Sequence, residues 1–285
     1  MKIAENNGIA KISEVHPETI IKRNAKQEIE QDAQSQIDTI NANNKSTNEE
    51  KSAAIDRVNV AKIDAINNIT NATTTQLVND AKNSGNTSIS QVLPSTAVKT
   101  NALAALATEA KNKNAIIDQT PNATAEEKEE ANNKVDRLQE EADANILKAH
   151  TTDEVNNIKN QAVQNINAVQ VEVIKKQNVK NQLNQFIDNQ KKIIENTPDA
   201  TLEEKAEANR LLQNVLTSAS DEIANVDHNN EVDQALDKAR PKIEAIVPQV
   251  SKKRDALNAI QEAFNSQTQE IQENQEATNE EKTEA

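Results

Sequence analysis

Apolar residues return at steps of three or four along three successive stretches of the chain, with polar residues between them. Such steps place the apolar side chains on one face of an α-helix. The steps are 4, 4 and 7 in the first stretch, 4, 3, 4 and 4 in the second, and 3, 4, 4 and 3 in the third. Each stretch therefore predicts an amphipathic helix of roughly 18–25 residues.

The three-stretch pattern occurs three times, so that each predicted core position has three occupants. In the first helix they are Ala25/Ala102/Val179, Ile29/Leu106/Leu183, Ala33/Ala110/Ile187 and Ile40/Ile117/Ile194. In the second they are Ala54/Ala131/Ala208, Val58/Val135/Leu212, Ala61/Leu138/Val215, Ala65/Ala142/Ala219 and Ile69/Ile146/Ile223. In the third they are Val78/Val155/Val232, Ala81/Ile158/Ala235, Gly85/Ala162/Ala239, Ile89/Ile166/Ile243 and Val92/Val169/Ile246.

A short motif, T-x-E-E-K, measures the period of this repetition. It begins at Thr47, Thr124, Thr201 and Thr278, a constant step of 77 in the numbering without insertion. A fixed period of this kind is typical of a repeat array. The predicted domains are a tail of a preceding repeat (1–17), three whole repeats (18–94, 95–171 and 172–248) and the start of a further repeat (249–285). Because both ends fall inside a repeat, we expect a longer parent chain.

Three helices within one period predict a small three-helix bundle in each repeat. Proline breaks a helix interior, so Pro17, Pro94 and Pro248 are expected where a third helix ends. Val171 takes their place in the remaining copy, and there a continuous helix could cross the junction. Short linkers favour a rod over flexibly joined beads. The predicted fold class is all-α, with tandem three-helix-bundle repeats forming an elongated rod on the order of 100 Å or more.

Composition supports long helices and excludes several classes of function. The 285 residues include 1% aromatic residues, two glycines, six prolines and no cysteine. Few glycines disfavour a β-rich fold, and the absence of cysteine excludes disulfide and thiolate chemistry. The net charge of −14 disfavours binding to the negatively charged phosphate backbone of nucleic acids, so we expect no nucleic-acid partner. We find no signal peptide and no apolar run of about 18 residues, so we expect no membrane insertion within this segment.

The T-x-E-E-K motif could be a ligand site, a metal site or a helix start. Thr124 precedes Glu127 by three residues, as in a capping box, and both carboxylates lie at the positive end of the helix dipole. A metal would need further oxygen ligands that no loop supplies. Asn122 begins a glycosylation sequon, but such triplets arise by chance in this composition. We interpret the motif as a capping box, and Thr151 with Glu154 as a second one.

The other polar residues show no arrangement typical of a catalytic or metal-binding site. His16, His150 and His228 do not recur in register, and we interpret them as solvated or boundary residues. Two lysine sets do recur, and they could form a ligand-binding stripe, although solvated faces are the simpler interpretation. These sets are Lys22/Lys99/Lys176/Lys253 and Lys51/Lys128/Lys205/Lys282. We expect no catalytic, cofactor-binding or metal residues, no cofactor and no enzymatic activity. Phe186 and Phe264 are predicted core residues.

The period, the T-x-E-E-K cap and third helices of the type VDQALDKARPKIEAI resemble one known repeat. It is the helical repeat of unknown function found in tandem in giant cell-wall-anchored surface proteins of staphylococci. The resemblance covers essentially the whole chain. It implies an exported, wall-attached protein whose repeats form a stalk, in a family linked with adhesion, cell–cell aggregation, biofilm, virulence, cell-wall integrity and methicillin resistance. The export signal and sorting motif of a full-length member do not occur in the sequence.

Three functions remain open at this point. The first is a structural stalk whose partners are the neighbouring repeats of the same chain. The second is a binding module for host matrix or plasma proteins, or for like molecules on other cells. It would need an exposed apolar or aromatic patch that recurs once in every repeat, and the sequence shows none. The third is an intracellular spectrin-like scaffold, although spectrin-like repeats are longer and usually carry a core tryptophan.

Overall fold

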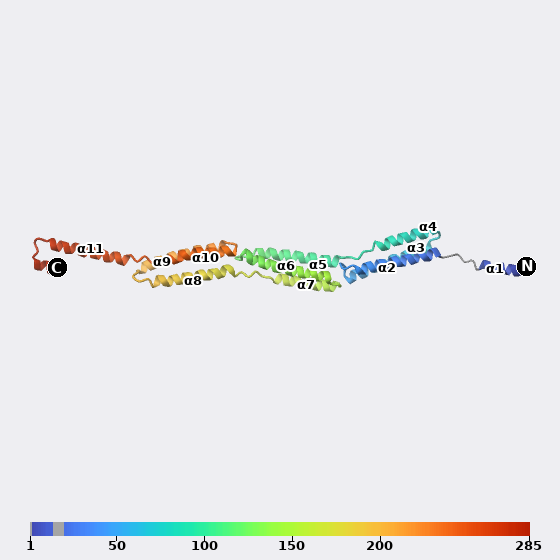
Figure 1. Cartoon of the computed structure of the whole chain (residues 1–285), viewed down its shortest axis with the longest axis horizontal. Helices are drawn as coiled ribbons and strands as arrows, with labels where there is room; N and C mark the ends of the chain where they lie inside the picture. The colour runs from blue at the N-terminus through green and yellow to red at the C-terminus, as the bar shows by residue number, and fades with distance from the viewer. Residues whose placement is uncertain (1, 14–19) are drawn as a thin grey trace. The chain divides into compact units, whose positions relative to one another are not determined.

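A computed structural model describes residues 2–13 and 20–285, and within 2–13 it places the side chains of residues 2–6 and 9 only. The described residues form α-helices and loops, with no strand among them (Figure 1). The all-α repeat fold predicted above is thereby confirmed. The helices are α1 (Lys2–Ser13), α2 (Ile20–Ala42), α3 (Asn48–Asn71), α4 (Thr75–Ser90), α5 (Ala97–Asp118), α6 (Ala125–Lys148), α7 (Thr152–Ala168), α8 (Lys175–Glu195), α9 (Leu202–Asn225), α10 (Asn229–Glu244), α11 (Lys252–Glu273) and α12 (Asn279–Glu284).

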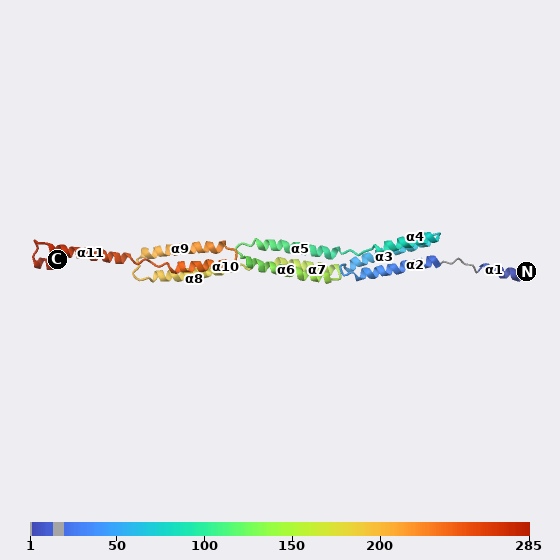
Figure 2. The ribbon, with the colours of Figure 1, turned by 45° about the horizontal axis from the view of Figure 1, so that its top comes forward.

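Helices α2, α3 and α4 pack against one another as a three-helix bundle (Figures 1 and 2). Their core consists of the aliphatic side chains that the pattern predicts, with Ile29, Ile40, Val58 and Ile69 fully buried. Much of this core is alanine, so each helix buries little area and the helices approach closely. At about 25 cal/mol per Å² of apolar area, one bundle gains only a modest stabilisation from burial.

Helices α8, α9 and α10 form a second bundle of the same kind. Leu183, Ile194, Leu212 and Ile223 are fully buried in its core. Phe186, a predicted core residue, is half-buried against this core. The guanidinium carbon of Arg240 lies 4.6 Å from the centroid of its ring, a cation–π distance.

The contacts divide the chain into two compact units, Met1–Ala115 with Asn133–Val169 and Ile116–Asn132 with Gln170–Ala285. The division therefore runs through α5 and α6 of the middle repeat. Within the first unit, α5 is tied to α6 by the Asn114 amide, which donates to Asp136 at 3.0 Å. It is tied to α7 by Asn167, whose amide donates to a carboxylate oxygen of Glu109 at 2.7 Å.

The structure corrects the prediction of a continuous helix at Val171. Helix α7 ends at Ala168 and α8 begins at Lys175, so this junction has a linker like the others. Val169 is already extended (φ −62°, ψ 131°). The linker contains no helix-breaking proline, but its β-branched residues have little helix propensity. The third helices, at 16 or 17 residues, are slightly shorter than the 18 expected.

The prediction that Phe264 is a core residue is wrong for this chain. Phe264 lies on α11 at the register position of Ile187, which is buried in α8. Its side chain is nevertheless 64% exposed, because no second and third helices of its own repeat cover α11 in the described residues. The predictions for His16 and Pro17 fall outside the described residues.

Candidate functional site: the junction between repeats

The T-x-E-E-K motif forms a capping box at the start of every described second helix. In α6, the Glu127 N–H donates to the Thr124 hydroxyl at 3.3 Å, and the Thr124 N–H donates to Glu127 Oε2 at 2.9 Å. The same reciprocal pair occurs in α3, α9 and α12. Two orphan N–H groups of the helix start are satisfied in each case. The helix-start interpretation of the motif is therefore confirmed.

The other oxygen of the capping glutamate binds the next repeat. Glu127 Oε1 accepts hydrogen bonds from the N–H groups of Ile174 and Lys175, at 2.8 and 2.7 Å, where α8 begins. Glu204 Oε1 accepts from the N–H groups of Ser251 and Lys252 at the start of α11, at 3.0 and 3.1 Å. One carboxylate thus caps its own helix and the first helix of the following repeat.

Glu50 makes the same connection at the first junction, with one variation. Its Oε1 accepts from the Val98 N–H at 3.1 Å and from the Ser95 hydroxyl at 2.8 Å. The Ser95 hydroxyl in turn accepts from the Ala97 N–H at 3.1 Å, so the start of α5 is still capped. All three junctions are therefore held by the same carboxylate position.

The first glutamate of the motif binds the third helix of the following repeat. Glu49 Oε2 accepts from the N–H and hydroxyl of Thr152, at 3.0 and 2.9 Å, at the start of α7. Glu126 Oε2 accepts from the Asn229 N–H at 3.0 Å, at the start of α10. A carboxylate at these helix starts is also stabilised by the helix dipole.

A backbone hydrogen bond accompanies each of these side-chain contacts. The N–H of Asn48 donates to the His150 carbonyl at 2.8 Å, and that of Ala125 donates to the Asp227 carbonyl at 2.7 Å. The His228 ring lies 3.2 Å from Glu126. The two described junction histidines, His150 and His228, are both exposed and sit in the turn before a third helix.

Hydrogen bonding keeps the junction carboxylates ionised. Donation from backbone N–H groups, chiefly that of Thr201, lowers the pKa of Glu204 to about 2, and donation from its own N–H and from Thr152 lowers that of Glu49 to about 2. For Glu50 and Glu127, burial is the largest single effect and raises the pKa, but the hydrogen bonds together outweigh it and the net pKa is lowered. At neutral pH the junctions therefore carry charge-assisted hydrogen bonds.

The interpretation of the first lysine set as a solvated face is wrong for Lys99 and Lys176, which are buried. The Lys99 ammonium donates to the carbonyls of Asn44 and Leu147, at 2.9 and 2.8 Å, in consecutive repeats. Lys176 donates to the Ala224 carbonyl at 2.9 Å. The Leu147 and Ala224 carbonyls lie in the last turns of α6 and α9, and the Asn44 carbonyl lies just beyond the end of α2, places where cations are favourable. Burial lowers the pKa of Lys99.

Three of the four lysines in the second set cap first helices. Lys51, Lys205 and Lys282 each donate to a carbonyl ten residues earlier, at 2.9, 2.8 and 3.1 Å. These carbonyls lie at or near the C-terminal ends of α2, α8 and α11. Both lysine sets therefore include members that bind helix-end carbonyls, which is an architectural use.

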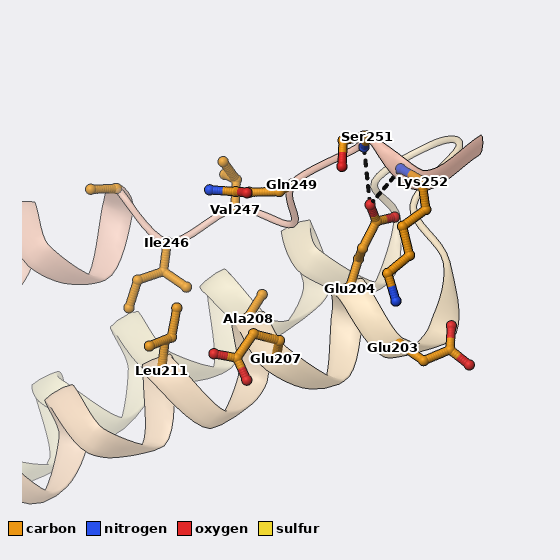
Figure 3. Close-up of a pocket in the computed structure, with 11 residues that line it drawn as sticks. Glu203, Glu204, Glu207, Ala208, Leu211, Ile246, Val247, Gln249, Ser251 and Lys252 are labelled. Atoms are coloured by element: carbon orange, nitrogen blue, oxygen red, sulfur yellow. Dashed lines mark hydrogen bonds between the residues drawn. The ribbon is translucent and has the colours of Figure 1, made fainter. Parts of the chain in front are cut away.

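An open groove of about 560 Å³ lies beside the third junction, between α9 and residues 245–252. Leu211 and Val247 supply apolar surface, and Glu203 and Glu207 supply charge (Figure 3). In the figure, Glu204 points from α9 to the N–H groups of Ser251 and Lys252.

Residue types and spacing show no metal or membrane feature in the described ranges. In residues 2–13 and 20–285, no three His, Asp or Glu side chains gather in a way that could hold a metal ion. No described helix combines the length and apolarity that crossing a bilayer requires.

The sequence alone did not reveal the bridging role of the motif. A capping box needs only one glutamate, yet both glutamates recur at all four copies. That second recurring glutamate was the available signal. The partner N–H groups lie 47 to 103 residues further on, too far for a local pattern to identify.

A comparison with known families matches almost the whole chain. The Domain of Unknown Function DUF1542 matches residues 21–97, 98–174, 175–251 and 252–285. The chain belongs to the DUF1542 family.

Curated relatives of this DUF1542 chain occur in Staphylococcus aureus. It is 27% identical over 215 residues to the extracellular matrix-binding protein ebh of strain MRSA252, covering 75% of this chain and 2% of that protein. It is 26% identical over 276 residues to the extracellular matrix-binding protein EbhA of strain Mu3, covering 96% of this chain and 4% of that protein. The chain thus spans a small fraction of the length of these relatives. No solved structure matches it.

Proposed function

We propose that this chain is a stalk segment of a bacterial cell-surface protein, in which coupled DUF1542 repeats act as a non-enzymatic spacer. The observation that carries the proposal is the bridging capping glutamate. Glu50, Glu127 and Glu204 each satisfy the first helix of the following repeat while capping their own second helix. Repeats that share a capping group cannot rotate freely about their linker without breaking charged hydrogen bonds. Such coupling favours an elongated rod over flexibly joined beads.

The proposed setting is the cell wall. The names of the curated relatives support a surface or extracellular location, and the sequence resemblance supports wall attachment. Within the family, that resemblance favours FmtB or SasC as the nearest parent. The proposal includes the roles that the resemblance implies: projection of an adhesive region, cell–cell aggregation, biofilm formation and cell-wall integrity.

Small-angle X-ray scattering of the purified chain tests the rod. Three helical repeats laid end to end predict a maximum dimension on the order of 100 Å or more. A compact protein of this length would have a radius of gyration of about 19 Å. A measured radius of gyration close to that compact value would contradict the stalk proposal.

A second candidate function is direct binding of extracellular matrix, as the relatives' names say of those proteins. A groove between the second and third helices recurs in all three whole repeats, with volumes of about 290, 400 and 190 Å³. Small residues at register-equivalent positions open it, for example Ala65, Ala142 and Ala219. Binding of the purified chain to immobilised fibronectin, with immobilised albumin as the control surface, tests this candidate. Equal binding to both surfaces would count against it.

A further inference from the structure

The linker between α7 and α8, residues 169–174, differs in composition from the linkers of the other two junctions. Its sequence, VQVEVI, alternates apolar and polar residues up to Val173, has four β-branched residues and contains no proline or glycine. Pro94 and Pro248 occupy the position of Val171 in the other two linkers. Proline lacks the N–H group that strand pairing uses, whereas valine is among the residues favoured in strands. Of the three linkers, the second alone therefore has the composition of a β-strand.

The conformation and exposure of this linker agree with that composition. Val169 has extended backbone dihedral angles, and no residue from 169 to 174 belongs to a helix. The three valines are buried or half-buried, and the residue that follows each of them is exposed. A strand with one face on the protein and the other face in solvent shows this alternation.

The backbone of the second linker also has fewer hydrogen-bond partners than that of the other two. At the first and third junctions a glutamine of the first helix donates to the carbonyl at the start of the linker, at 2.7 Å in both cases: Gln36 to Val92 and Gln190 to Ile246. Lys113 replaces this glutamine in the second repeat, and its ammonium donates to the Asn167 carbonyl at 3.0 Å. Within residues 20–285, the Val169 carbonyl and the N–H groups of residues 170–173 have no hydrogen-bond partner.

The segment is complementary to a second copy of itself. In an antiparallel pair centred on Val171, each valine lies opposite a valine of the other copy, and Gln170 lies opposite Glu172. The amide can then donate to a charged acceptor on both sides of the centre. A pair centred on Glu172 would instead place two carboxylates opposite each other, which like-charge repulsion disfavours. The side chains therefore favour one register of self-pairing.

We propose that residues 169–173 are a strand-pairing site for the same segment of a second copy of this chain. The unpaired backbone groups supply the hydrogen bonds of the pair, and the contacts between valines and between Gln170 and Glu172 set its register. Two copies paired in this way run in opposite directions along the linker, as chains that project from facing surfaces would. The pairing does not depend on the bridging glutamates and so lies beyond the stalk of the proposed function.

The contact is expected to be weak and strengthened by salt. A single pair of short strands is marginally stable in water and buries less area than a stable dimer interface. The net charge of −14 on each chain adds a repulsion that salt screens. Sedimentation velocity of the purified chain up to millimolar concentration, at low and high salt, therefore tests the proposal. Dimers should form, more of them at high salt, and hydrogen exchange of the amides of residues 170–173 should slow as they do.

Val171→Pro is the substitution that removes strand pairing with least risk to the fold. It deletes one N–H group of the pair, and both other linkers already carry proline at this position. The variant should keep the helical circular dichroism and the urea midpoint of the parent chain while its dimerisation is lost. A dimer that forms equally well in Val171→Pro would overturn the proposal.

Charge variants of Gln170 test the register. Gln170→Lys places a cation opposite Glu172 twice in each dimer and should tighten the dissociation constant by about threefold to tenfold, and Gln170→Glu should weaken it by a similar factor. Leu93, at the equivalent position of the first linker, provides the matched controls Leu93→Lys and Leu93→Glu, which should act only weakly through net charge.

Three results would overturn the proposal. The first is a chain that stays monomeric at every concentration and salt level. The second is a dimer that responds equally to the Gln170 and Leu93 variants, because the contact would then lie elsewhere. The third is a monomeric chain whose binding to immobilised fibronectin is lost in Val171→Pro, which would assign the linker to a matrix partner instead of a second copy.

Discussion

Glu127→Ala is the substitution that probes the bridge most sharply. It removes one capping contact within α6 and two hydrogen bonds to the start of α8. Loss of a helix cap costs about 1 kcal/mol. A hydrogen bond to a charged group contributes about 1.5–3 kcal/mol, and solvent reaches this half-buried carboxylate, so we expect about 2–4 kcal/mol for the pair. The predicted total is therefore about 3–5 kcal/mol.

Glu281→Ala is the matched control within the same chain. Glu281 forms the same capping box with Thr278 but has no hydrogen bond to a following repeat in the described residues. Its loss should cost less than that of Glu127 and should appear as faster amide exchange confined to α12. Glu127→Ala should accelerate exchange at the Ile174 and Lys175 amides as well as in α6, and should lower the urea midpoint. Equal and purely local effects of the two substitutions would refute the bridging role.

Three further predictions follow from single positions. The depressed pKa of Glu204 stabilises the fold above the unfolded-state value near 4.5, and this contribution is lost as the pH falls toward about 2; urea titrations from pH 6 to 2 should show a smaller loss in Glu204→Gln than in the wild type. Gly85→Ala would bring a Cβ into a clash with that of Ala65 and should destabilise the first bundle by about 1–2 kcal/mol in thermal unfolding, despite better helix propensity. Pro241 lies inside α10, and its replacement by glutamine, the residue at the equivalent position Gln164, should raise the urea midpoint by the equivalent of about 1–2 kcal/mol; no increase would mean that the helix already accommodates the ring.

The core could be predicted because it depends on local periodicity. All twelve predicted core positions of the first helices, among them Ile29, Leu106 and Leu183, are buried. Repetition supplied three independent occupants for every position, which separates a buried face from chance. Only a few expected positions, such as Ala61 and Val215, are half-buried at the edge of a bundle.

The junction could not be predicted because its contacts are long-range and polar. A local sequence pattern predicts that Lys99 is an exposed surface residue. It is only 3% exposed, because its ammonium binds carbonyls from two repeats. The local sequence correctly predicts that Glu127 caps its own helix. Nothing in the neighbouring residues indicates that its second carboxylate oxygen also accepts hydrogen bonds. The loop before α8 contains no helix-breaking residue. The start of α8 is set instead by the Glu127 carboxylate, which accepts hydrogen bonds from the N–H groups of Ile174 and Lys175.

Spin-label distance measurement across one junction tests the central claim most directly. The chain has no cysteine, so Asn112→Cys and Asn189→Cys place two labels at equivalent exposed positions of consecutive repeats. If the motif glutamates couple the repeats, the distance distribution should be narrow and should broaden markedly on addition of Glu127→Ala. A broad distribution in the parent chain, unchanged by Glu127→Ala, would contradict the account.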